Sequence, residues 1–181
     1  MRLDVFLLAS LPSALGMQLA YSPPPALMAK VAAQDDCVLP GTYEVRDFAG
    51  KSNDTGSTLA SFDFKFVDPA TKLETSCHFN ETSVSGSPSA LAPRYPCEHG
   101  EVKFIWEADK TKLWMIERVC PGPDGYDDPF NPATYLQKAD FEVSGSLLLP
   151  VTCAPEGSCG TNSTLHTSKF TSLQPVRDPT I

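Results

Sequence analysis

Histidine and positive charge are both scarce in this sequence. The chain has three histidines among 181 residues, and its 14 lysines and arginines are outnumbered by 22 aspartates and glutamates, which gives a formal net charge of −8. Scarce histidine limits acid–base chemistry near neutral pH. Binding to nucleic acid or to an anionic membrane surface requires clustered positive charge, so the composition argues against both kinds of partner.

Long hydrophobic runs are missing after the first 20 residues. Residues 1–20 combine one early arginine with a mostly apolar stretch and with small residues at two candidate cleavage points, Gly16 and Ala20, a pattern typical of a secretory signal peptide. The apolar run is shorter than the roughly 20 residues of a membrane-spanning helix, and Pro12 and Ser13 interrupt it. We therefore expect residues 1–20 to be a signal peptide and the protein to be secreted and extracellular.

Glycosylation triplets and cysteines agree with secretion. Acceptor triplets for N-glycosylation begin at Asn53, Asn80 and Asn162, whereas the asparagine at 131 is excluded by the proline that follows it. The six cysteines all lie beyond residue 20. In an oxidising compartment an even number of cysteines predicts disulfides. They are Cys37, Cys77, Cys97, Cys120, Cys153 and Cys159.

No part of the sequence sustains the spacing of apolar residues by three and four that is typical of helices. Apolar and polar residues instead alternate with a period of two. The clearest example is the run in which Phe62, Phe64 and Phe66 face one way while polar residues face the other. Similar runs predict strands over residues 42–48, 59–67, 73–79, 102–107, 112–119, 135–143, 147–151 and 165–173. Residues 108–111 suit a hairpin turn, and residues 144–146 are expected to break the pair on either side of them.

Many short strands separated by turn-forming residues predict an all-β protein, a compact antiparallel β-barrel or sandwich stapled by disulfides. We expect one such domain over residues 37–175. The proline- and alanine-rich residues 21–36 are expected to form a flexible N-terminal arm, and residues 176–181 a C-terminal tail.

Candidate catalytic and metal-binding residues are few. The sequence has no Gly-x-Ser-x-Gly motif of a serine hydrolase. His78 follows Cys77 and His99 follows Cys97 by two residues, which offers a thiol nucleophile or a zinc site. Neighbouring strand residues point to opposite faces, however, zinc sites usually carry Cys-x-x-Cys, and the secretory pathway oxidises thiols. We therefore assign no catalytic residue, no metal site and no cofactor.

Three weaker patterns remain open. The acidic run from Asp124 to Asp128 offers carboxylates to calcium but lacks regular ligand spacing, so a solvated turn is the simpler interpretation. Trp106 and Trp114 flank the predicted hairpin and can form a sugar-stacking platform, although alternation turns at least one of them into the core. A pair of carboxylates for glycoside hydrolysis depends on the spacing that the fold imposes.

The order and spacing of residues from Cys37 to Cys159 resemble the Alternaria major-allergen-like family of small secreted fungal proteins. The resemblance rests on Cys37 followed by the run 43–48, on the run 62–66, on Cys77, on Tyr-Pro-Cys-Glu at 95–98 and on the pair Cys153 and Cys159. It implies a compact β-barrel, usually with disulfides and often dimeric, in a fungal family with no agreed enzymatic activity.

The resemblance also implies a pairing of the cysteines. By position, the two internal bridges of the family fall on Cys77–Cys97 and Cys153–Cys159. The counterpart of Cys37 can link two chains in the family. This sequence departs from the family by having Cys120, which by parity can pair with Cys37 within one molecule, so both a monomer and a homodimer are possible.

These observations lead to one functional expectation and two alternatives. We expect a non-enzymatic secreted fungal effector or allergen-like protein that binds a host component, either a plant protein or a small ligand. The first alternative is an extracellular protein that binds carbohydrate or the cell wall through exposed aromatic side chains. The second is a small secreted hydrolase that uses a pair of carboxylates.

Overall fold

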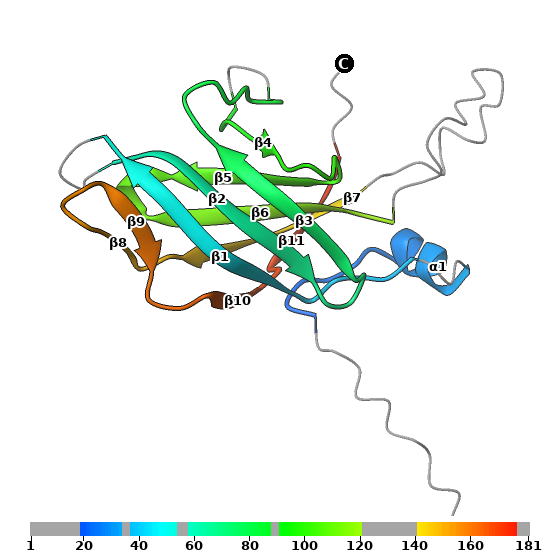
Figure 1. Ribbon diagram of the computed structural model, residues 1–181. Helices are drawn as coiled ribbons and strands as arrows, with labels where there is room; N and C mark the ends of the chain where they lie inside the picture. The colour runs from blue at the N-terminus through cyan, green and yellow to red at the C-terminus, as the bar shows by residue number, and fades with distance from the viewer. Residues whose placement is uncertain (1–18, 34–36, 54–57, 88–90, 121–140, 177–181) are drawn as a thin grey trace, which may run out of the picture.

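The chain forms two antiparallel β-sheets that face each other (Figure 1) in a computed structural model that describes residues 19–33, 37–53, 58–87, 91–120 and 141–176. Sheet A contains β1 (Thr42–Ser52), β2 (Leu59–Asp68), β3 (Leu73–Phe79), β8 (Val151–Cys153), β9 (Ser158–Thr161) and β10 (Leu165–Lys169). Sheet B contains β4 (Tyr95–Pro96), β5 (Val102–Glu107), β6 (Lys112–Val119), β7 (Phe141–Leu148) and β11 (Ser172–Pro175). The all-β prediction is confirmed.

The two sheets form a sandwich. The strand order is β3-β2-β1-β9-β8 in sheet A, where β10 also pairs with β1, and β11-β7-β6-β5-β4 in sheet B. One edge of β1 pairs along its length with β2, while the other edge pairs first with β10 and then with β9. Within the described ranges no strand pairs with both sheets, so the sandwich is the correct one of the two predicted architectures.

The core lies between the inner faces of the sheets and is rich in aromatic rings. Phe62, Phe64 and Phe66 of β2 are all buried, which confirms the alternation predicted for this run. The ring of Phe64 meets the ring of Phe104 on β5 edge to face at 5.3 Å between centroids. The predicted hairpin is also confirmed, because β5 and β6 pair antiparallel from Glu107 and Lys112 outward around the short 3₁₀ turn Ala108–Lys110.

The predicted break at residues 144–146 is wrong, because β7 runs through them without interruption. The chain passes close to Gly145 on its inner side: a side chain there would overlap the carbonyl oxygen of Lys169 and would lie 2.9 Å from Cε1 of Tyr43. Glycine at this position therefore permits a close approach of two backbones and does not form a turn.

The predicted strand over residues 165–173 is in fact two strands in different sheets. β10 pairs with β1 in sheet A, and β11 pairs with β7 in sheet B. The chain crosses between the sheets at Phe170, whose side chain is fully buried. A single alternating run in the sequence conceals this crossing, because both halves are extended and the buried Phe170 between them continues the alternation.

The N-terminal segment is not the flexible arm that its composition predicts. Residues Pro25–Ala33 form the helix α1, and both Leu27 of this helix and Tyr21 before it are buried in the core. The hydroxyl of Tyr21 donates to the carbonyl of Pro40 (2.6 Å), and Lys30 Nζ donates to the carbonyl of Cys120 (2.6 Å). No helix in the described part of the chain is long and apolar enough to cross a membrane.

All six cysteines are joined in disulfides. Cys77–Cys97 joins β3 of sheet A to the residue after β4 of sheet B, and Cys153–Cys159 closes the hairpin of β8 and β9. Cys37–Cys120 joins the segment before β1 to the residue after β6. These pairs coincide with those given by the family resemblance and by parity, and Cys37 is bonded within its own chain.

The terminal segments and the glycosylation triplets are described only in part. Residues 1–18 of the expected signal peptide and residues 177–181 of the expected tail lie outside the described ranges. The side chains of Asn53, Asn80 and Asn162 are all exposed. Exposure is what a glycan needs, and glycosylation at these positions stays a prediction.

Two carboxyl groups are buried where the core meets the turn between β2 and β3. Asp68 accepts hydrogen bonds from the backbone of Ala70 (2.8 Å) and from the hydroxyl of Thr71 (2.6 Å). Glu117 of β6 is 2 % exposed, and its Oε1 lies 3.4 Å from the same hydroxyl. Burial, reinforced by the negative charge of Asp68, raises the pKa of Glu117 to about 9.

The disulfides give a first prediction about stability. On the loop-entropy model, a bridge over a sequence separation of 83 stabilises roughly 2 kcal/mol more than one over a separation of 6. We expect the double variant Cys37→Ser/Cys120→Ser to lose that much more unfolding free energy than Cys153→Ser/Cys159→Ser. Guanidinium unfolding followed by tryptophan fluorescence measures both. Equal losses in the two variants would contradict the prediction.

Glu117 gives a second prediction, on the pH dependence of stability. Between pH 4.5 and about 9 the folded protein keeps the Glu117 proton that the unfolded chain releases, so its contribution to stability falls as the pH rises, by at most about 1.4 kcal/mol per pH unit. Glu117→Gln removes this loss. We expect the variant to gain stability relative to the wild type as the pH rises from 5 to 8 in chemical unfolding. A difference that is independent of pH would refute the raised pKa.

Candidate functional site

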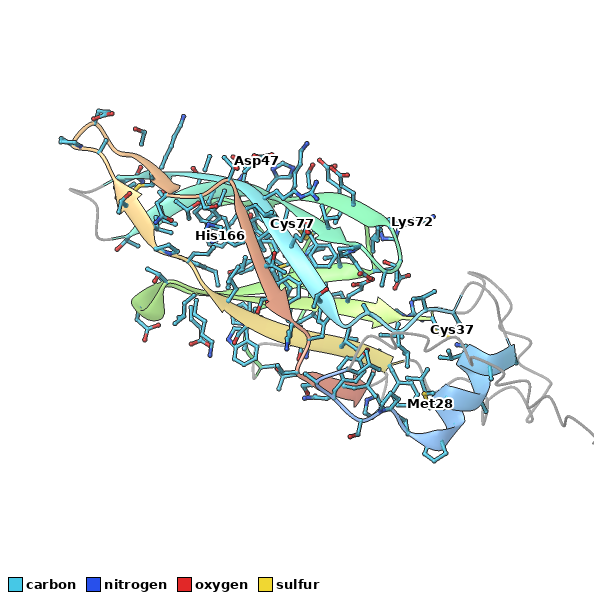
Figure 2. All side chains as sticks on the ribbon, turned by 90° about the horizontal axis from the view of Figure 1, so that it is seen from below. Met28, Cys37, Asp47, Lys72, Cys77 and His166 are labelled. Carbon is cyan, nitrogen blue, oxygen red and sulfur yellow. A yellow bond between two sulfur atoms is a disulfide. The ribbon has the colours of Figure 1, made fainter. Side chains whose placement is uncertain are left out.

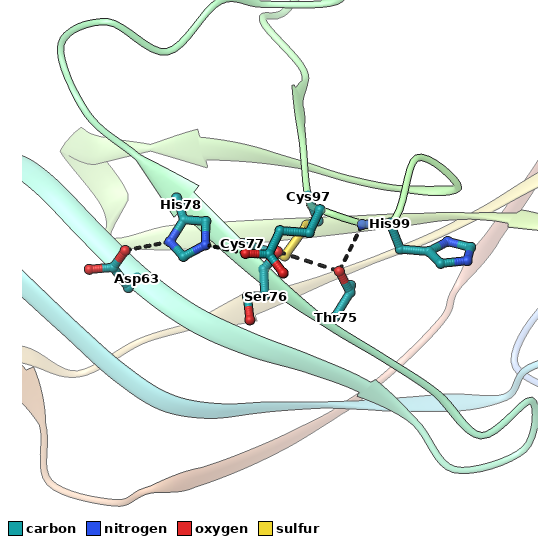
Figure 3. Close-up of a disulfide and its surroundings, with 8 residues drawn as sticks. Asp63, Thr75, Ser76, Cys77, His78, Cys97 and His99 are labelled. Carbon is teal, nitrogen blue, oxygen red and sulfur yellow. Dashed lines mark hydrogen bonds and ion pairs between the residues drawn. A yellow bond between two sulfur atoms is a disulfide. The ribbon is translucent and has the colours of Figure 1, made fainter.

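The cysteine and histidine chemistry considered from the sequence is not assembled. Cys77 and Cys97 form a disulfide, so neither supplies a thiolate to a substrate or to zinc. Cys77 is buried in the core while His78 is exposed on the outer face, as the alternation predicts (Figure 3). The acidic run 124–128, considered for calcium, lies outside the described residues.

His78 is held between two carboxylates on the outer face of sheet A. Its Nδ1 lies 2.6 Å from Oδ1 of Asp63, the residue directly across on β2, and its Nε2 lies 3.0 Å from Oε1 of Glu98 (Figure 3). The hydrogen bonds that the ring makes to the carboxylates of Asp63 and Glu98 raise the pKa of His78. A raised pKa extends to higher pH the range in which the ring is protonated and has no lone pair with which to accept a proton. The cluster links two strands and a loop.

The hollow next to this cluster has few features of a binding site. Its volume is ≈ 410 Å³, and it is lined by polar and charged side chains that include the exposed ion pair Lys65–Glu74 (3.9 Å). Ligand sites are usually apolar with a few placed polar groups. This hollow instead has a mostly polar lining.

The outer face of sheet B carries an apolar strip. Ile105 on β5 lies directly across from Trp114 on β6, and Ile116 follows two residues later on the same face. These side chains form a hollow of ≈ 80 Å³, which we call the sheet B groove. Its lining residues are Arg94, Ile105, Trp114, Ile116, Glu142, Ser144 and Gln174. Ile105 and Trp114 are half-buried and Ile116 is 4 % exposed. The strip lies on the side of the sheet that faces away from the core, and none of its three residues belongs to the core cluster between the sheets.

A network of charges flanks the strip. Arg94 Nη1 lies 2.7 Å from Oε2 of Glu142, and Lys103 Nζ lies 3.7 Å from the other carboxylate oxygen. The Glu142 side chain is 11 % exposed, and a carboxylate this buried requires such partners. The ion pairs fix Arg94 at the edge of the groove.

The two tryptophans have different surroundings. The ring of Trp106 packs in the core, 5.2 Å from Phe62 and 6.2 Å from Phe48 between centroids. Trp114 lies on the outer face, where its indole Nε1 donates to Glu107 (2.6 Å) and Lys112 Nζ lies 4.2 Å from its ring centroid. The expectation that at least one tryptophan faces the core is confirmed, and the described outer face of sheet B offers one tryptophan instead of a paired platform.

Sequence reasoning singled out Trp114 but missed Arg94 and Glu142. Alternation along β7 places Glu142 on the same face as Ser144, so this part of the site had a readable signal. Arg94 reaches the groove from the loop before β4, and no periodic pattern indicates such a contact. The hydrogen bond that joins Arg94 to Glu142 spans 48 residues of the chain.

Comparison with known proteins gives matches at the level of structure alone. No family model and no curated protein matches the sequence. One similar solved structure, the Alternaria alternata major allergen Alt a 1, has 13% identity and a TM-score of 0.44, covering 76% of this chain and 95% of that chain. A second structure of Alt a 1 has 15% identity and a TM-score of 0.40, covering 73% and 82% of the respective chains. At these values the likeness says nothing about function, which has to be argued from the residues of this chain.

The His78 cluster gives a third prediction. We expect the pKa of His78 to lie above 6.5, chiefly because of its bond to Asp63, and Asp63→Asn to bring the pKa down towards that value. The stability that the cluster adds is fully present below pH 6.5 and is lost as the pH rises through the raised pKa. NMR titration of the ring protons measures the shift, with Glu74→Gln as a matched control on the same face. A wild-type pKa at or below 6.5 would show that the histidine is available as a base.

Proposed function

We propose that this protein is a secreted, non-enzymatic fungal effector that binds a host protein outside the cell through the sheet B groove. The observation that carries the proposal is the apolar strip of Ile105, Trp114 and Ile116 on the outer side of a sheet whose inner side already packs in the core. Tryptophan and arginine dominate the binding energy of protein interfaces, and here Trp114 and Arg94 border one hollow.

The size of the groove favours one anchoring side chain over a whole small molecule. Pockets for drug-sized ligands measure roughly 300–1,000 Å³, whereas this hollow measures ≈ 80 Å³. A partner that inserts one apolar side chain between Ile105 and Ile116 matches this volume. The paired charges of Arg94 and Glu142 then form part of the polar rim that surrounds the anchors of protein interfaces.

The surroundings of Trp114 favour a protein over a polysaccharide as the binding partner. A sugar ring stacks on an open aromatic face, but the Lys112 ammonium already lies over this ring and Glu107 already bonds its indole nitrogen. The two isoleucines beside it are branched and offer no flat surface. Branched apolar side chains around a rigid aromatic anchor instead provide the close packing found at the centre of protein interfaces.

Secretion belongs to the same proposal and has its own support. Disulfides persist in oxidising compartments, and all six cysteines of this chain are in disulfides. The three acceptor asparagines are exposed, as glycosylation in the secretory pathway requires.

The test of the proposed function compares three immobilised proteins in extracellular fluid from a plant host. We expect the wild type to capture a host protein and Lys65→Ala, on the outer face of sheet A, to capture the same amount. Trp114→Ala should capture at least tenfold less, because truncation of a central interface residue commonly costs about 2 kcal/mol or more of binding free energy. Quantitative mass spectrometry measures the capture, and calorimetry with the purified partner measures the affinity.

The same three proteins distinguish the alternative. Sedimentation with insoluble cell-wall polysaccharides that is lost in Trp114→Ala, without capture of a host protein, would replace the proposal by a carbohydrate-binding function. Equal capture by all three proteins would show that the sheet B groove is not the binding surface.

A further inference from the structure

A third cavity lies at the end of the sandwich, between the segment before β1 and the turn between β2 and β3. Figure 2 shows Cys37 and Lys72 at this end, and Figure 1 shows α1 beside the start of β3. The cavity measures ≈ 170 Å³. Val38, Leu73 and Val119 line it with aliphatic surface, and Glu117 lines it with a carboxyl group.

Glu117 is the unusual member of this lining. It is 2 % exposed, and within the described part of the chain no N–H or hydroxyl group donates to its Oε2, while a hydrogen bond with the carboxylate of Asp68 contributes to its raised pKa. An unpartnered buried polar atom is costly, so such an atom at a cavity points to a group that completes it. Asp68 does not need one, because the turn that follows it already donates to both of its carboxylate oxygens.

The charged and titratable groups around Glu117 are mostly acidic or already paired. Asp68, at the end of β2, raises the pKa of Glu117, and both carboxyl groups in turn raise the pKa of the Tyr21 hydroxyl in the N-terminal segment. At the rim, Arg118 Nη1 lies 3.5 Å from Oε1 of Glu101, and His99 completes the lining. Lys30, from α1, donates to the carbonyl of Cys120, another lining residue. The surroundings therefore combine acceptor oxygens with aliphatic walls.

We propose that this cavity binds a small primary ammonium ion with a short aliphatic chain. An ammonium group has three N–H donors, and the site offers three acceptors in the two oxygens of Glu117 and the hydroxyl oxygen of Thr71. That hydroxyl donates its own proton to Asp68 and accepts from the backbone N–H of Leu73 (3.4 Å), which leaves one lone pair for the ligand. The carbon chain of the ligand lies along Val38, Leu73 and Val119.

Binding of such a ligand displaces one proton. Glu117 enters as the neutral acid at neutral pH, because burial raises its pKa to about 9. An alkylammonium holds its proton more tightly, with a pKa of about 10.4 for the lysine side chain. The complex therefore contains a carboxylate and an ammonium, and the carboxyl proton passes to the solvent. Because binding releases a proton, the affinity rises about tenfold for each unit by which the pH increases, as long as the pH stays below the pKa of Glu117.

The experiment titrates the full protein with n-butylammonium chloride in phosphate and in imidazole, two buffers of different ionisation enthalpy that lack primary amines. We expect saturable binding, release of about one proton for each ligand and a roughly tenfold gain in affinity from pH 6.5 to 7.5. Glu117→Gln, which keeps the shape of the side chain, should bind n-butylammonium at least tenfold more weakly. Glu74→Gln, an exposed carboxylate on sheet A, should bind as the wild type does.

Two further measurements make the outcome unambiguous. n-Butanol has the same chain and no charge, so it should bind at least tenfold more weakly and release no proton. Val38→Trp obstructs the exposed mouth of the cavity without changing the core, and it should also abolish binding. No saturable binding to the folded wild type at pH 8, equal binding of butanol or unchanged binding by Glu117→Gln would each overturn the inference.

Discussion

The ring of Phe62 lies at the centre of the aromatic contacts between the two sheets. Phe62 on β2 is fully buried, and its ring lies beside rings from β1, β3 and β5, namely those of Phe48 (5.3 Å), Phe79 (5.0 Å) and Trp106 (5.2 Å between centroids). Each such pair adds about 0.5–1.5 kcal/mol beyond the burial of area. Because Trp106 belongs to sheet B, these contacts close the sandwich. The inner faces are thereby occupied, and the half-buried Ile105 and Trp114 outside sheet B take no part in closing the sandwich.

The sequence predicts those parts of the fold that neighbouring residues determine. Alternation in β2 and the tight turn between β5 and β6 depend on residues next to one another, and both predictions are confirmed. The strand through Gly145 and the burial of Leu27 depend on partners distant in the chain, which composition does not reveal. A glycine between two serines has the composition of a turn, and a proline- and alanine-rich segment has that of a linker, until the packing partner is known.

The candidate sites follow the same rule. Trp114 was recognisable from its residue type, whereas Arg94 enters the groove from an irregular loop. Glu117 occupies an inward position between Met115 and Val119, so alternation alone could have placed a carboxyl group in the core. Its neighbour Asp68 belongs to the other sheet, and the cavity beside Glu117 is lined in part by Val38 and Pro40 from the segment before β1. The fold thus separates an apolar outer groove from an acidic cavity at one end.

The most direct test of this account uses its two tryptophans, one on each side of sheet B. The indole N–H resonances of ¹⁵N-labelled protein can be followed by NMR as the partner is added. Trp114 lies in the groove and Trp106 packs in the core, so the account predicts that the Trp114 resonance shifts or broadens on binding while the Trp106 resonance stays in place. An unchanged Trp114 resonance in the saturated complex would contradict it.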